Sequence, residues 1–206
     1  MVEALRTYET TVGSQSRALP VVPLSDDLAI ALLITVDHGV AFSARAGEDL
    51  AKLLAPLQVD VVVSVATMGI PLAIEVSRAL GLDDYLILQK TPKIHLADAI
   101  SEPVRSITTD RRQRLLFDRA RVGAVRGKRV ALIDDVVSTG ASVRAALSLV
   151  RRVGGQPVAI GALLTEASTW RTTLREDATL VHALGAVPLF RRRGDGTLDE
   201  DWDGAA

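Results

Sequence analysis

The amino-acid sequence predicts an α/β fold with an open, mainly parallel sheet flanked by helices. Its 206 residues suit a single domain that buries a sizeable core. Because 48% of the residues are hydrophobic and only 3% are aromatic, that core must be largely aliphatic, which suits a sheet covered by helices. Val59–Gln89 also runs strand, helix, strand, a unit whose strands pair in parallel through a right-handed crossover.

Residues 1–38 are expected to form a lead-in, or hood, over the core. Residues 1–25 show little periodicity and contain Gly13, Ser14, Pro20 and Pro23, so we expect irregular structure there. A first helix is predicted over residues 39–54, because apolar residues recur at helical spacing and a proline ends the run. These residues are Phe42, Ala46, Leu50, Leu53, Leu54 and Pro56.

The core is expected over residues 39–190. The β-branched run Val59–Val65 predicts a strand, which leads through residues 66–69 into a helical pattern ending at Gly81. Tyr85–Gln89 predicts the next strand. The charged stretch that follows has β-prone pieces at Val104–Thr108 and Leu115–Phe117 around the basic cluster 110–114, a pattern typical of a hairpin with a mobile tip.

The core resumes with a buried strand predicted over Arg129–Ile133, followed by Asp134, Asp135 and a turn of small residues. A helix is expected from about Ala141 to Val153, ending at a Gly-Gly pair, and Pro157–Thr165 predicts another apolar strand. We expect residues 191–206 to form a loose tail. The whole chain is interpreted as one domain.

Charge and composition narrow the class of partner. The chain has 24 Lys and Arg residues against 25 Asp and Glu residues, so no overall field would hold it on nucleic acid or on an anionic membrane. It has no cysteine, which excludes disulfides and a thiol nucleophile. The start is polar and no apolar run approaches the roughly 20 residues of a membrane span. These features favour a cytoplasmic protein with a small-molecule partner.

The segment Val130–Ser142 holds the strongest candidate site. Ligands of open α/β sheets bind outside the carboxyl ends of the strands, where Asp134 and Asp135 are expected. The following residues, Ser138–Ser142, supply hydroxyls and backbone N–H groups where a helix begins, which suits a phosphate. The alternative is an ordinary helix N-cap beside an exposed acidic pair.

This segment resembles the signature of the type I phosphoribosyltransferases, which bind phosphoribosyl pyrophosphate (PRPP). The resemblance implies that Asp134 and Asp135 are the catalytic acidic pair, binding the ribose hydroxyls directly or through PRPP-bound Mg²⁺. It also implies a cradle for the 5′-phosphate and a loop that binds pyrophosphate through its backbone. The cradle is Ser138, Thr139, Gly140, Ala141 and Ser142, and the pyrophosphate loop is Ala66, Thr67, Met68 and Gly69.

Two further parts follow from the same resemblance. Lys90 takes the place of a basic residue near the pyrophosphate, with a solvated surface lysine as the alternative. Residues 106–118 resemble a flexible lid that closes over PRPP, and its candidate contacts are Thr108, Thr109, Arg111 and Arg112. Similar enzymes often carry an acidic residue or an arginine in the pyrophosphate loop, whereas this chain has neither.

Residues 24–190 resemble the purine branch that contains adenine and xanthine phosphoribosyltransferases. Hypoxanthine-guanine enzymes usually have an acidic residue where this chain has Ser138, so we expect adenine first, with xanthine or guanine next. The base is expected under the hood, near Val21–Leu28 and Leu163–Glu166. The resemblance also implies a homodimer and a role in purine salvage.

Other functions stay open. Some proteins with this fold sense PRPP and regulate transcription, but the roughly 35 residues before the first helix are few for a DNA-binding module. A subunit that serves mainly assembly is a third possibility. His38, His95 and His182 are widely separated and suggest no metal site, and the loop is not a Walker A sequence, which argues against an ATPase.

Overall fold

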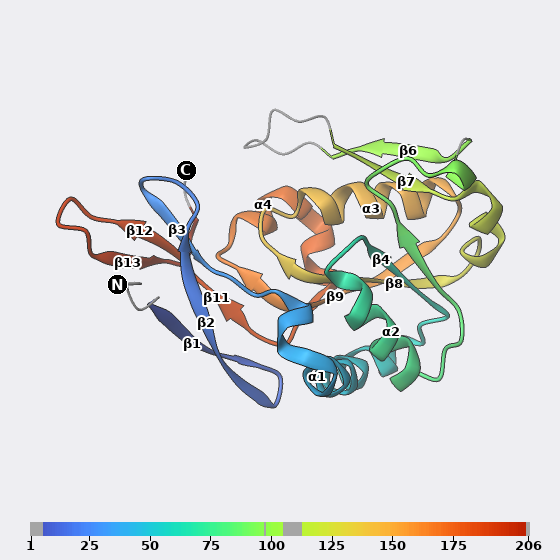
Figure 1. Cartoon of the computed structure of the whole chain (residues 1–206). Coiled ribbons are helices and arrows are strands. Elements are labelled where there is room, and N and C mark those ends of the chain that lie inside the picture. The colour runs from blue at the N-terminus through green and yellow to red at the C-terminus, as the bar shows by residue number, and fades with distance from the viewer. Residues whose placement is uncertain (1–5, 97, 105–112, 205–206) are drawn as a thin grey trace.

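The computed structural model describes residues 6–96, 98–104 and 113–204. A parallel sheet forms its middle layer, with α1 (Gly39–Leu54) and α2 (Gly69–Ala79) on one face and α3 (Ala141–Arg152) on the other (Figure 1). The first helix has the bounds expected from the sequence. Among the described residues, no helix is both long and apolar enough to span a membrane.

The main sheet has the strand order β10-β9-β8-β4-β5, with β11 also pairing with β9. All of these pairs are parallel, which confirms the predicted α/β class. The strands are β4 (Val61–Val65), β5 (Tyr85–Leu88), β8 (Arg129–Val137), β9 (Gln156–Glu166), β10 (Val181–Ala183) and β11 (Ala186–Val187).

Alternation along the central strands divides the core between the two faces of the sheet. Val61, Val63 and Val65 belong to the cluster under α3, whereas Val62 belongs to the cluster under α1 and α2. Since successive side chains of a strand point to opposite faces, a continuous apolar run is what a strand covered on both sides requires. This explains why the sequence shows β-branched runs here without alternating polar residues.

Strand β8 is longer than the sequence predicted. It was expected to end at Ile133, but it continues to Val137, so Asp134 and Asp135 lie inside the strand and not in a turn after it. The reason is its neighbour β9, which stays paired with β8 as far as the pair Val137–Thr165. Pairing with a neighbouring strand can therefore keep polar residues in a strand, although the local sequence pattern indicates that the strand ends before them.

Strands from the first and last parts of the described chain form a second, antiparallel sheet with the order β1-β2-β3-β12-β13, which we call the hood sheet (Figure 1). Its strands are β1 (Thr7–Val12), β2 (Gln15–Pro23), β3 (Leu28–Ala31), β12 (Leu189–Arg192) and β13 (Leu198–Asp201). The expectations of an irregular lead-in and a loose tail were both wrong. The pairing of β3 with β12 joins residues about 160 apart, and no local sequence pattern reports such a contact.

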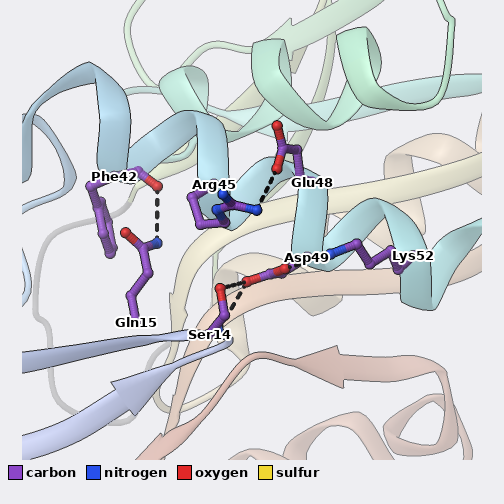
Figure 2. Close-up of polar contacts among 7 residues, drawn as sticks. All are labelled: Ser14, Gln15, Phe42, Arg45, Glu48, Asp49 and Lys52. Atoms are coloured by element: carbon purple, nitrogen blue, oxygen red, sulfur yellow. Dashed lines mark hydrogen bonds and ion pairs between the residues drawn. The ribbon is translucent and has the colours of Figure 1, made fainter.

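The tip of the β1–β2 hairpin is attached to α1 by a polar latch (Figure 2). The N–H and hydroxyl of Ser14 both donate to Asp49 Oδ2, at 2.9 and 2.6 Å, and Gln15 donates to the carbonyl of Phe42 at 3.2 Å. Gly13 has φ +60°, and a Cβ there would lie 2.7 Å from Asp49 Oδ2. The tip thus needs both a left-handed backbone and the absence of a side chain.

A hairpin of β6 (Ile100–Pro103) and β7 (Arg114–Phe117) packs on α3 through Leu115 and Phe117 (Figure 1). Its second strand agrees with the sequence prediction. Its first strand precedes the expected piece Val104–Thr108, of which residues 105–108 lie outside the described residues. The register pairs Pro103 with Arg114, which places the proline at the end of an edge strand, where it disturbs no ladder.

Candidate functional site

The acidic pair lies at a fork in the main sheet. Strand β4 pairs with β8 only as far as the pair Ser64–Ile133, while β8 continues through Asp134 and Asp135 along β9. Beyond the fork, these two residues have a strand partner on the β9 side alone. In open α/β sheets this carboxyl edge, where neighbouring strands separate, is the place where ligands bind.

Gly69, the first residue of α2, fits closely against the fork. A Cβ at this position would lie 3.3 Å from Asp134 Cα, 3.2 Å from the Ile133 carbonyl oxygen and 2.5 Å from Ser64 Oγ. The loop Ala66–Gly69, whose Ala66–Thr67 peptide bond is cis, is thereby brought beside the acidic pair. The residues predicted for pyrophosphate therefore lie next to those predicted for ribose.

Burial and a neighbouring charge act on Asp134. Burial raises the pKa of its carboxyl well above the usual range, and the charge of Asp135 raises it further. The positive charge of Lys90, an exposed residue just after β5, acts in the opposite direction on the pKa of Asp134. The charge of Lys90 thus acts on Asp134, and its contact with pyrophosphate stays a prediction.

The predicted phosphate cradle connects β8 to α3. Gly140 has φ +77°, a left-handed conformation that glycine adopts without strain, and it caps the start of α3. A Cβ on Gly140 would lie 3.3 Å from Trp170 Cα, so the loop rests directly on α4 (Thr169–Leu174). The N–H of Ala141 donates to Thr139 Oγ1 at 3.4 Å, and the first turn of the 12-residue α3 presents the positive end of the helix dipole, which suits an anion.

Ser138, at the start of this cradle, donates a hydrogen bond of 2.5 Å to Glu166 Oε1. Glu166 is only 9% exposed, and burial raises the pKa of its carboxyl, while the bond from Ser138 partly lowers it. The sequence indicated Glu166 only as the end of a segment near the base. Its one usable signal was an acidic residue that closes an otherwise apolar strand.

The segments predicted to cover the base, residues 21–28 and 163–166, differ in how far they are buried. Val21 of β2 and Leu163 of β9 are both buried in the cluster beneath α1, so the hood sheet and the main sheet share a core. Leu24, at the turn after β2, is 63% exposed. The hood sheet therefore packs on the main sheet through β2, while the turn that follows β2 is exposed.

The predicted lid contacts Thr108, Thr109, Arg111 and Arg112 lie outside the described residues. Glu102 and Pro103 of β6 line a cavity of about 370 Å³ together with residues of α3. Those residues are Ala141, Arg144, Ala145 and Ser148. This part of the hairpin thus lies beside the first two turns of the helix that follows the phosphate cradle.

The donor set fits Mg²⁺ that arrives with a phosphorylated ligand. Within the described ranges, no group of three or more His, Cys, Asp or Glu side chains forms a metal cage. Mg²⁺ is usually held by one or two carboxylates together with substrate phosphates and water. The neighbouring carboxylates Asp134 and Asp135 offer this limited set, so the metal would need the ligand to complete its coordination.

Comparison with known families gives a match over most of the chain. The model of the phosphoribosyl transferase domain matches residues 42–181. This region contains β4, β8 and β9 with the fork, the acidic pair, the predicted phosphate cradle and Glu166. It excludes the hood strands β1, β2, β3, β12 and β13.

Curated relatives include enzymes and regulators. The chain is 24% identical over 159 residues to a xanthine phosphoribosyltransferase from Brevibacillus brevis, covering 76% of this chain and 80% of that enzyme. It is 27% identical over 174 residues to a probable purine biosynthesis transcriptional regulator from Streptococcus pneumoniae, covering 83% of this chain and 58% of the regulator. A match to an orotate phosphoribosyltransferase spans 53% of that enzyme, about half its length.

Solved structures share the fold. An adenine phosphoribosyltransferase from Rhodothermus marinus superimposes with a TM-score of 0.62 over 81% of this chain and 92% of that chain, at 21% identity. At this identity the likeness establishes the arrangement of the sheet and helices, and the base must be argued from the site itself.

Proposed function

Since the chain belongs to the phosphoribosyl transferase domain family, we propose that it transfers ribose 5-phosphate from PRPP to a free purine base. The products would be a nucleoside 5′-monophosphate and pyrophosphate, and the reaction would serve purine salvage. The observation that carries the proposal is the fork, where the acidic pair Asp134 and Asp135 lies between the N-terminal ends of α2 and α3.

Each part of the fork would hold one part of PRPP. The carboxylates of Asp134 and Asp135 would accept hydrogen bonds from the ribose hydroxyls. The N–H groups of residues 138–142 and the hydroxyls of Thr139 and Ser142 would bind the 5′-phosphate at the start of α3. Residues 66–69 with Lys90 would bind the pyrophosphate at the start of α2. Bound Mg²⁺ would supply positive charge against the departing pyrophosphate.

The transfer needs little covalent work from the protein. The bond between the anomeric carbon and the pyrophosphate oxygen breaks, a purine nitrogen forms the new bond to that carbon, and the nitrogen loses its proton to solvent. Because the ribose carbon becomes cationic in between, the site must align the base and exclude water. The hood sheet would cover the base, and the lid residues Thr108, Thr109, Arg111 and Arg112 would contact the leaving group.

We propose adenine as the first choice of base and xanthine or guanine as the next. Support for adenine comes from Ser138, where an acidic residue is usual in hypoxanthine-guanine enzymes. Support for xanthine comes from the relative that matches 76% of this chain. A homodimer, a dependence on Mg²⁺ and a cytoplasmic location belong to the same proposal.

A PRPP-sensing regulator is the second candidate. The observation in its favour is the match to the streptococcal regulator over 83% of this chain, which includes the fork. A sensor would use the same acidic pair and phosphate cradle but would not transfer ribose. The two candidates therefore predict the same ligand and differ only in turnover.

An assay of purified protein with a panel of bases distinguishes the enzyme from the PRPP-sensing regulator. The protein is mixed with PRPP, Mg²⁺ and one of adenine, guanine, hypoxanthine, xanthine, uracil or orotate, and pyrophosphate release is measured. Release with adenine or xanthine supports the enzyme. PRPP binding by calorimetry without release on any base would favour the sensor, and no PRPP binding at all would contradict both.

A further inference from the structure

Glu166 makes a contact that the transfer mechanism above does not use. It is the last residue of β9, it is 9% exposed, and its Oε1 accepts a hydrogen bond of 2.5 Å from Ser138. The two residues are 28 positions apart, and their contact joins the start of the predicted phosphate cradle to the end of the neighbouring strand. A buried carboxylate is costly unless it is hydrogen-bonded, and the Ser138 hydroxyl supplies such a bond.

The residues that follow Glu166 support the cradle at a second point. Ala167 donates to the carbonyl of Val187 at 2.9 Å and receives a bond of 3.0 Å from the indole N–H of Trp170, which fixes the start of α4. The same Trp170 lies against Gly140, whose added Cβ would meet its Cα at 3.3 Å. One segment, residues 166–170, therefore contacts both Ser138 and Gly140 of the cradle.

We propose that Glu166 is a positioning residue, which holds the 5′-phosphate cradle in its binding shape by fixing Ser138 while Trp170 supports Gly140. Glu166 itself does not touch the phosphate, because two carboxylate oxygens beside a phosphate would repel it. The inference rests on the proposed function, since it assumes that residues 138–142 bind the 5′-phosphate. It assigns to the end of β9 a role in binding phosphate that is separate from the base.

The proposal predicts which ligands depend on Glu166. PRPP and ribose 5-phosphate both carry the 5′-phosphate, so a disordered cradle must weaken the binding of both ligands by the same factor. Pyrophosphate is expected at residues 66–69, which the segment 166–170 does not support. A defect confined to the two ribose phosphates would therefore distinguish positioning of the cradle from general damage to the fold.

The test compares Glu166→Leu, which removes the acceptor at similar size, with Glu166→Gln, which keeps a side-chain oxygen that can accept from Ser138. Calorimetry measures Kd for PRPP, ribose 5-phosphate and Mg²⁺-pyrophosphate on full-length protein. Loss of a hydrogen bond to a charged group predicts that Glu166→Leu binds both ribose phosphates about tenfold more weakly and pyrophosphate unchanged. Glu166→Gln is expected to stay within about threefold of wild type.

Asp177→Asn is the matched control, because it disrupts the contact of Arg151 with Asp177 at the far end of α3. It should leave all three Kd values unchanged. If Glu166→Leu does not fold, Glu166→Ala removes the same acceptor without adding an apolar side chain and should weaken ribose 5-phosphate binding similarly. Unchanged ribose 5-phosphate binding, or an equal loss for pyrophosphate, overturns the inference, whereas wild-type protein that binds no PRPP overturns the proposed function.

Discussion

Gly69 and Asp134 are in direct backbone contact at the fork of the main sheet: a Cβ at Gly69 would lie 3.3 Å from Asp134 Cα. The contact joins the start of α2 to the strand that carries the acidic pair, although the two residues are far apart in sequence. Any side chain at residue 69 must push the two predicted ligand-binding segments apart. This relationship makes the fork testable by single substitutions.

Gly69→Ala is expected to destabilise the protein and to weaken pyrophosphate binding. Overpacking at a site bounded by backbone costs about 1–3 kcal/mol of unfolding free energy, because the Ile133 carbonyl and Asp134 Cα cannot rotate away. Urea unfolding and calorimetry with Mg²⁺-pyrophosphate measure the two effects. Gly123→Ala is the control, since nothing lies within 4 Å of the added methyl group. Equal stability of the two variants would contradict the close fit.

Replacing the acidic pair by Asp134→Asn with Asp135→Asn should abolish PRPP binding while the fold stays intact. The ribose hydroxyls would lose their charged acceptors, and Mg²⁺ would lose its carboxylates. Calorimetry with PRPP and circular dichroism check the two statements. PRPP affinity equal to that of the wild type would remove these residues from the site.

The single variant Asp134→Asn should raise the thermal midpoint, and the gain should grow with pH. Burial raises the pKa of Asp134 in the folded protein, so ionisation opposes folding once the pH exceeds the ordinary value of an aspartate. The asparagine side chain does not ionise, so the variant does not lose stability in this way as the pH rises. Melting curves between pH 4 and pH 8 test the sign, and a gain that shrinks as the pH rises would contradict it.

Asp49→Asn should loosen the latch between the β1–β2 hairpin and α1. The Ser14 hydroxyl is the main cause of a pKa of about 2 for Asp49, so ionised Asp49 stabilises the fold at neutral pH. The loss should be about 1–2 kcal/mol of unfolding free energy near pH 7. This contribution disappears as the pH falls below the ordinary value of an aspartate and through about 2.

Denaturant unfolding at pH 7 and pH 3 measures the effect of the latch. Glu48→Gln is the control one residue away, because its ion pair with Arg45 is half exposed on both sides and should change stability by less than about 0.5 kcal/mol. Equal losses for the two variants would show that the latch contributes no more than a surface ion pair.

Asp201→Asn should release the C-terminal residues from the hood sheet. The Asp201 carboxylate accepts from Arg191 at 2.8 Å and from the N–H of Gly204 at 2.8 Å, and the Arg191 contact is the main cause of its lowered pKa. Hydrogen exchange of β13 amides should speed up several-fold, with little change in α3. Unchanged exchange in β13 would mean that backbone pairing alone holds this strand.

Much of the main sheet could be predicted from the sequence because its signals are local. Helix α1 has the expected bounds since apolar spacing and Pro56 act within a few residues of one another. The strands β4, β5 and β9 follow from β-branched and apolar runs. The acidic pair and the cradle stood out because strand, carboxylates and small residues are contiguous in the chain.

The sequence by itself therefore determined the parallel α/β core and the residues at its carboxyl edge. Only the tertiary structure decided that β8 continues through Asp134 and Asp135, that residues 7–31 and 189–201 join in the hood sheet, and that Glu166 accepts a bond from Ser138. The physical reason is the same in each case. These features depend on partners distant in the chain, and a hydrogen bond or strand pair with a distant partner leaves no periodicity in the local sequence.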